Sequence, residues 1–237
     1  MVGRLITGSL TPVRVLAAYD EGQGNSPVSV IRRHPERPLS ENTVYRHLRE
    51  LREHLTPPPG LDYPEISDGQ LVMMMSPRPR HQVNAKRVTR QLDQQLPDGI
   101  FAYESTDTDD ELLGKLRVPD VLVVSEEAML AAEPTLDPRE ILLAVEIVSP
   151  SNPDNDYRDK LADYPRMGIP RYLIVDPREG TWSYHWDIVT NGGVPAYASR
   201  LGKRPFGDAV TIDTEVGRWT IETVGLPLYT ETDMALG

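Results

Sequence analysis

The chain has 237 residues, of which 39% are hydrophobic and 26% are charged, values typical of a soluble globular protein with a substantial core. It contains no cysteine, which excludes disulfides, thiolate metal sites and cysteine nucleophiles. The formal net charge of -11 argues against nonspecific binding to nucleic acid, although bound divalent cations would cancel part of that charge.

The hydropathy pattern bears on where the protein resides. No apolar run approaches the roughly 20 residues that a membrane-spanning helix needs. The first ten residues hold only a broken apolar stretch, which disfavours a secretory signal. We therefore expect a cytoplasmic protein without membrane association.

The N-terminal third divides into an extension and the start of a domain. Residues 1–39 have no sustained periodicity and several glycines and prolines, which predicts a loosely ordered extension ahead of one domain over 40–237. A helix is expected from Ser40 to about Leu55. Its apolar stripe comprises Val44, Leu48, Leu51 and Leu55.

A hairpin and a second helix are expected next. Tyr63–Ser67 and 70–75 flank an Asp68-Gly69 turn, the strongest short hairpin signal. A basic helix follows from about Arg80 to Leu96, and it is either a solvated face or a phosphate-contacting surface. Its buried candidates are Val83, Val88, Leu92 and Leu96. Beyond a strand at 100–106, the acidic stretch 107–111 predicts a solvated turn.

The remaining pattern predicts the fold class. Strands are expected at 118–124, 141–148 and 172–175, with short helices at 126–132 and 156–164, the second ended or bent by Pro165. An antiparallel pair at 181–186 and 194–200 and short strands in the tail complete the series. Hairpins combined with a strand–helix–strand crossover predict an α/β fold, a mixed central sheet with flanking helices.

One strand of the predicted antiparallel pair carries three aromatic residues. Trp182, Tyr184 and Trp186 alternate along it and so share one face. Core or dimer contact explains this face better than base stacking. If the strand lies at a sheet edge, it could support a homodimer.

Three charged residues interrupt or follow the buried apolar runs. Asp120 and Glu146 stand inside two predicted strands, and Lys160 stands on the helix that follows. A buried carboxylate is costly unless it is paired, hydrogen-bonded or bound to a metal. Hard oxygen ligands suit Mg²⁺ or Mn²⁺, so the pattern suggests a divalent-cation site. An ion pair of Lys160 with Glu146 or Asp156, without metal, explains the spacing equally well.

An ordered set of motifs carries a family resemblance over about residues 40–230. The set comprises Pro119-Asp120, Val145-Glu146-Ile147-Val148-Ser149-Pro150-Ser151, Asp156-Tyr157-Arg158-Asp159-Lys160 and Tyr172-Leu173-Ile174-Val175-Asp176-Pro177, with Glu65 to Leu71, Ser76-Pro77 and His81 upstream. This set resembles the Uma2 family of the PD-(D/E)XK nuclease-like superfamily. The resemblance implies a restriction-endonuclease-like core and a restriction-endonuclease type of activity.

The resemblance also implies roles for individual residues. Asp120 and Glu146 would ligate the metal, the Ile147 carbonyl would add an oxygen, and Lys160 would position or activate the water. Val148 occupies the place where the superfamily usually has its catalytic lysine, so this role moves to Lys160. His81 would approach the scissile phosphate as a donor or proton shuttle, the alternative being a structural histidine.

Three further carboxylates have no assigned role. Asp156 either orients Lys160, joins the metal shell or caps the helix, and the cap is the favoured interpretation. Glu65 could face the same cleft, but an exposed strand carboxylate explains it better, and Glu104 is comparable.

Two functions follow from these expectations. The first is a Mg²⁺- or Mn²⁺-dependent endonuclease that cleaves DNA phosphodiester bonds through a metal-activated water. The second is a catalytically inactive protein that keeps the nuclease fold as a binding or regulatory module. A glycoside hydrolase with two carboxylates fits less well, because it leaves Lys160 without a role.

Overall fold

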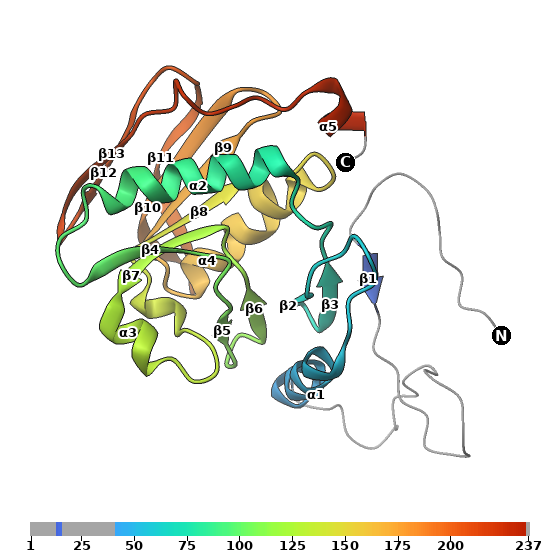
Figure 1. Ribbon diagram of the computed structural model, residues 1–237. Helices are drawn as coiled ribbons and strands as arrows, with labels where there is room; N and C mark the ends of the chain where they lie inside the picture. The colour runs from blue at the N-terminus through green and yellow to red at the C-terminus, as the bar shows by residue number, and fades with distance from the viewer. Residues whose placement is uncertain (1–12, 16–40, 236–237) are drawn as a thin grey trace, which may run out of the picture.

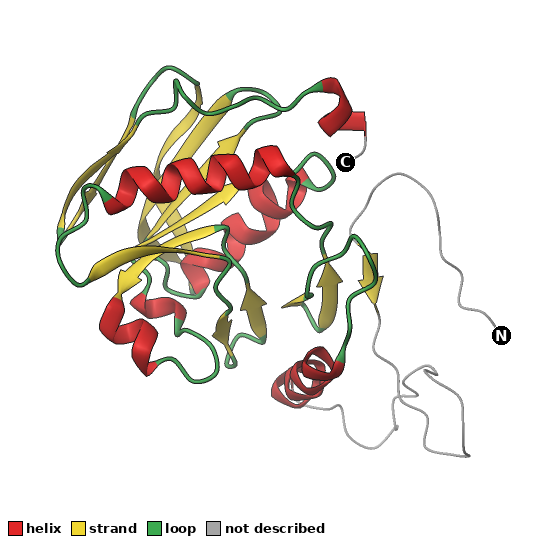
Figure 2. Cartoon of the chain, in the orientation of Figure 1, coloured by secondary structure: helices red, strands yellow, loops and turns green. Residues whose placement is uncertain are grey.

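The computed structural model describes residues 13–15 and 41–235, and it confirms the predicted α/β class with a mixed central sheet and flanking helices. Figures 1 and 2 show a larger sheet crossed by a long helix, beside a smaller sheet that lies next to α1. No described helix is both long and apolar enough to cross a bilayer.

The larger sheet has the strand order β11-β10-β9-β8-β7-β4. Only β8 and β9 pair in parallel, and the segment between them forms the predicted crossover, while the other neighbours are antiparallel. These strands are β4 (Ile100–Glu104), β7 (Val121–Ser125), β8 (Leu143–Ile147), β9 (Arg171–Asp176), β10 (Thr181–Asn191) and β11 (Val194–Pro205).

Helices cover both faces of this sheet (Figure 1). On one face, α2 (Pro79–Asp93) buries Val88 and Leu92 against β7 and β8, and the ribbon β12 (Val210–Thr214) and β13 (Gly217–Ile221) joins that core. On the other face, the π-helix η2 (Asn155–Lys160) and α4 (Leu161–Arg166) follow β8. Each fully buried aliphatic side chain contributes about 1.5–3 kcal/mol.

The smaller sheet has the order β1-β3-β2-β6-β5. Its strands are β1 (Val13–Val15), β2 (Glu65–Ser67), β3 (Gln70–Met73), β5 (Thr108–Asp110) and β6 (Lys115–Arg117). Helix α1 (Glu41–His54) buries Tyr45 and Leu48 against it. Asp68 and Gly69 have φ values of 51° and 69°, as the predicted type of tight hairpin turn requires.

Short elements complete the described chain: α3 (Glu126–Ala131), the 3-10 helix η1 (Pro138–Glu140) and α5 (Glu231–Ala235). The predicted loosely ordered extension over 1–39 lies outside the described residues except for β1, which pairs with β3. The division into an extension and a domain over 40–237 stays a prediction.

Three local predictions were wrong. Residues 108–110 form β5 rather than a solvated turn, because Asp107 and Asp109 make ion pairs with Arg52 and Arg49 of α1. Val83 is 41% exposed rather than buried.

Pro165 lies inside α4 one residue before its last residue, Arg166, close to the predicted end of the helix. The third error concerns the second half of the chain. The aromatic strand 182–186 is not at a sheet edge, because β10 lies between β9 and β11. Trp182 and Tyr184 pack in the core, so the argument for a homodimer through this strand fails, although dimerisation itself stays untested.

Candidate active site

Asp120 and Glu146 meet where the antiparallel strands β7 and β8 separate. Val121 pairs with Val145, so the next position along each strand places Asp120 opposite Glu146. The ladder ends there, and the Ile147 backbone N–H donates to Asp120 Oδ2 at 2.7 Å instead. This hydrogen bond holds the Asp120 carboxylate beside the end of β8.

Lys160 reaches the same place from η2. Its Nζ lies 2.8 Å from Glu146 Oε1 and 3.3 Å from Glu65 Oε1. Burial lowers the pKa of Lys160, but surrounding carboxylates, led by Glu146 and Glu65, outweigh it and raise the pKa above its ordinary value. Lys160 is therefore a fixed ammonium that can position a water or offset negative charge, and it is a poor base.

Glu146 is held from two sides. Besides the Lys160 contact, Tyr164 donates its hydroxyl to Glu146 Oε1. Burial and the nearby carboxylates of Asp120 and Asp156 raise the pKa of Glu146 well above its usual range, despite Lys160. A further positive charge at this point would therefore stabilise the ionised form.

His81 lies at the first turn of α2, which starts with Pro79 at its N-terminus. Its Nε2 is 3.1 Å from Asp120 Oδ2. Burial lowers the pKa of His81, but the Asp120 carboxylate and the Ile147 backbone raise it by more, so the net shift is upward. Burial alone would raise the pKa of Asp120, but the nearby His81 lowers it by more, so the pKa of Asp120 lies below its ordinary value. The contact supplies a proton donor at the cavity wall.

Asp156 faces the site rather than capping a helix. The N-cap of η2 is Asp154, so the favoured interpretation of Asp156 as a cap is wrong. A π-helix has a wider turn than an α-helix; it is rare in proteins, and the examples that occur are often at functional sites. Asp156 lies 3.9 Å from Lys160, and its burial, with Asp120 and Glu65 nearby, raises its pKa to about 7.

A buried charge network underlies the site, and sequence reasoning missed its centre, Arg117. This guanidinium is 1% exposed; its Nη1 donates to Glu65 Oε2 at 2.7 Å, and it also contacts Asp163. Glu65 also accepts the Val118 N–H, so it is not the exposed strand carboxylate expected. The sequence gives little signal for this burial, because Arg117 ends a strand of only three residues, two of which are basic.

The remaining candidates lie outside this cluster. Glu104 is exposed and pairs with Lys86 at 3.0 Å. Val148, which directly follows β8, is fully buried in the same core cluster as Tyr164, so this position contributes an apolar side chain to the core and none to the cavity. Lys160 is the lysine that contacts Glu146.

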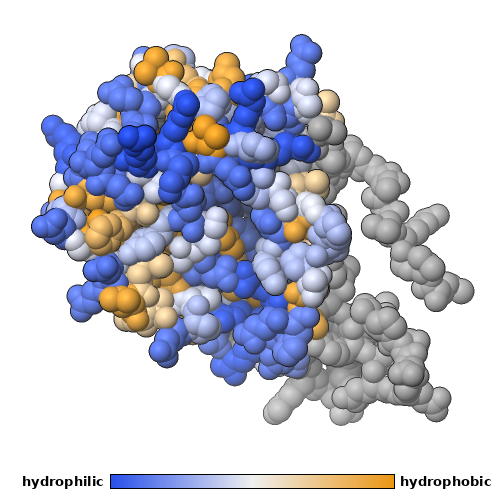
Figure 3. Space-filling model, viewed as in Figure 1, coloured by the Kyte–Doolittle hydropathy of each residue, from blue (hydrophilic) through white to orange (hydrophobic). Residues whose placement is uncertain are grey.

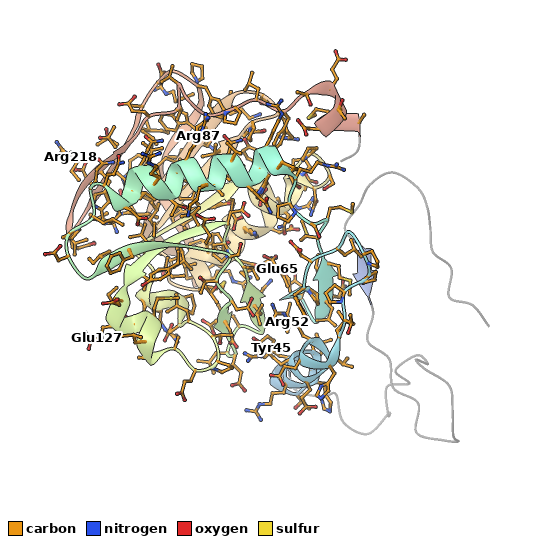
Figure 4. The ribbon with its side chains drawn as sticks, in the orientation of Figure 1. Tyr45, Arg52, Glu65, Arg87, Glu127 and Arg218 are labelled. Carbon is orange, nitrogen blue, oxygen red and sulfur yellow. The ribbon has the colours of Figure 1, made fainter. Side chains whose placement is uncertain are left out.

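The clustered side chains open into a cavity of about 690 Å³ between the two sheets. It is lined by residues that include Glu65, His81, Asp120, Glu146, Ile147, Asp156 and Lys160. Figure 4 labels Arg52, which comes from α1, and Glu65, which comes from β2, and both line this cavity. Figure 3 shows that the visible surface is mainly hydrophilic, with scattered hydrophobic residues.

The donor set has the chemistry of a hard divalent cation. Carboxylate oxygens of Asp120, Glu146 and Asp156 lie around the cavity, and such oxygens suit Mg²⁺ and Mn²⁺. The hydroxyl of Tyr229, another lining residue, is buried without a hydrogen-bond partner among the described residues, as expected where a water or ion completes a site. Within residues 13–15 and 41–235, no three histidine, cysteine, aspartate or glutamate side chains already form a metal cage.

The fold and the site together define an α/β protein with clustered carboxylates and a lysine beside a mixed sheet. Known proteins of a nuclease-like family are similar to this chain. A family model described as "Uma2: Putative restriction endonuclease" matches residues 49–187. The chain belongs to the Uma2 family. No curated protein matches it.

One solved structure is similar to part of this chain. It is titled as a putative nuclease belonging to DUF820 from Anabaena variabilis, and it is 15% identical in sequence. The match covers 56% of this chain and 76% of that chain, with a TM-score of 0.46.

Proposed function

We propose that this protein is a Mg²⁺- or Mn²⁺-dependent endonuclease that hydrolyses DNA phosphodiester bonds. The observation that supports it best is the convergence of Asp120, Glu146 and Lys160 on one cavity, from β7, β8 and η2. Membership of a nuclease-like family points to the same reaction class.

The donor groups for the cation are Asp120 and Glu146, with the Ile147 carbonyl as a third oxygen and Asp156 as a further carboxylate. When bound, the cation supplies Lewis-acid stabilisation of charge on the phosphate and lowers the cost of forming hydroxide from water. Burial and mutual repulsion raise the pKa values of Glu146 and Asp156, and a bound cation would stabilise their ionised forms.

The protein's own groups have separate tasks. The Lys160 ammonium orients the attacking water by hydrogen bonding and offsets negative charge in the transition state. His81, held by Asp120, donates a proton or hydrogen bond to a phosphate oxygen at the cavity wall. Lys160 and Arg117 together keep Glu65 ionised, and the Arg117 guanidinium holds its carboxylate in place.

Cleavage of plasmid DNA with and without Mn²⁺ tests the proposal. Glu146→Gln keeps the side-chain shape but weakens the cation site, and we expect activity to fall at least about a hundredfold, as when a catalytic electrostatic contact is lost. Glu104→Gln is the matched control, because Glu104 is an exposed carboxylate outside the cavity. Equal cleavage by both variants would contradict the assignment.

A binding or regulatory module is the second candidate. It is favoured by the contacts of Glu146, whose Oε1 is already satisfied by Lys160 and Tyr164. Calorimetry with Mn²⁺ separates the two candidates. Binding that is lost in Asp120→Asn and Glu146→Gln supports the nuclease, and no binding by the wild-type protein supports the module.

A further inference from the structure

An exposed aromatic side chain stands at the rim of the cavity. Tyr63 precedes β2 and is 56% exposed, although it lines the same cavity as Asp120 and Glu146. Exposed aromatic rings are costly to leave in water, and Tyr63 belongs to none of the core clusters. The ring is therefore available to a ligand.

The ring is held in place by its surroundings. The Arg52 guanidinium carbon lies 5.8 Å from the ring centroid, within cation–π range. Arg52 is itself fixed by two hydrogen bonds to Asp107, of 2.6 Å and 2.8 Å, and by one to the Pro64 carbonyl, of 2.7 Å. One face of Tyr63 is thus supported, and the exposed surface lies elsewhere on the ring.

The backbone on both sides of the ring is also anchored. The Asp62 N–H donates to the Met74 carbonyl at 3.0 Å, and the Pro64 carbonyl accepts from Arg52. Because this backbone is already held, a ligand that binds here loses little free energy to ordering the protein, which favours affinity.

The cavity has exposed apolar side chains at its rim and buried charged side chains in its interior. Tyr63 and Met75 at the rim are 56% and 42% exposed, whereas the side chains of Glu146 and Lys160 are 2% and 6% exposed. A nucleotide has the same division, with an apolar base face and a charged phosphate. Its phosphate would meet the charged interior while its base meets the rim.

We propose that Tyr63 stacks on the base of an unpaired nucleotide whose phosphate enters the candidate active site. The inference deepens the proposed function and rests on it, because it names the form of the substrate. A base inside a duplex is covered by its neighbours, so stacking on Tyr63 requires a single strand or an extruded base.

Binding of a fluorescent single-stranded oligonucleotide tests this by anisotropy, with Ca²⁺ in place of Mg²⁺. We expect Tyr63→Ala to weaken binding about 5- to 150-fold, the usual loss for one base–aromatic stack. Tyr63→Trp should retain affinity. Phe101→Ala is the matched control, because Phe101 is an aromatic residue that is 41% exposed but does not line the cavity.

The same strand carrying abasic sites identifies the group that Tyr63 contacts. Wild-type protein and Tyr63→Ala should bind the abasic strand equally well, since it has no base to stack there. An equal loss on both strands, or no loss on either, would overturn the inference, as would wild-type protein that binds no single strand. A base-dependent loss without any metal-dependent cleavage would leave the stacking site standing and refute the nuclease.

Discussion

Replacing Arg117 with methionine removes the cation at the centre of the buried network. Arg117 is 1% exposed and joins Glu65 to Asp163, whose side chains are 4% and 5% exposed. Breaking a buried ion pair by removing one partner typically costs 3–5 kcal/mol. Lys160 lies 3.3 Å from Glu65 and Lys115 lies 2.9 Å from Asp163, so partial compensation remains. We expect a loss of about 3 kcal/mol.

Urea unfolding at neutral pH measures this loss from the shift in midpoint at constant m-value. The matched control is Arg218→Met, because Arg218 also pairs with an aspartate but is 71% exposed, and water screens an exposed pair so that its loss should cost little. If the Arg117→Met protein is no less stable than the Arg218→Met protein, the network does not stabilise the fold as argued.

The pH dependence gives a second check on Arg117. Burial raises the pKa of Glu65, but Lys160 and Arg117 lower it by more, so the folded pKa lies below the ordinary value. Glu65 therefore stabilises the fold above its unfolded pKa, and this contribution is lost as the pH falls through the folded pKa. In Arg117→Met the contribution is smaller, so the difference in stability between the two proteins should shrink in acid. A difference that grows in acid would refute the reasoning.

Three further predictions concern the site and the fold. The pKa of Asp156 is raised to about 7, so protons compete with the cation for this carboxylate near neutral pH. Mn²⁺ affinity measured by calorimetry should therefore rise as the pH increases through 7, and Asp156→Asn should make the affinity less dependent on pH. Leu92→Ala should cost about 2–5 kcal/mol in urea unfolding because Leu92 is fully buried, whereas Leu130→Ala, at an 81% exposed position, should cost almost nothing. Gly69→Ala should lower thermal stability by about 1 kcal/mol because Gly69 has a φ of 69°, and an unchanged melting temperature would argue against that turn geometry.

Local pattern determined much of the fold from the sequence alone. The apolar runs around β7, β8 and β9, the Asp68-Gly69 hairpin and the stripe of α1 each predicted an element close to its observed bounds. These signals are local because strand and helix periodicity and turn residues act within a few positions. The same pattern indicated Asp120, Glu146 and Lys160, since charges inside or beside apolar runs are unusual.

Only the tertiary structure decided which charges share one environment. Arg117 and Glu65 are 52 positions apart in the chain. A strand of only three residues, such as β6, is too short to show a periodic sequence pattern. Likewise, the composition of the acidic stretch 107–111 predicts a solvated turn, but Arg49 and Arg52 of α1 form ion pairs with two of its aspartates. A charged side chain can be buried only where partners neutralise it, and here those partners come from segments distant in the sequence. A local sequence pattern therefore does not predict the burial.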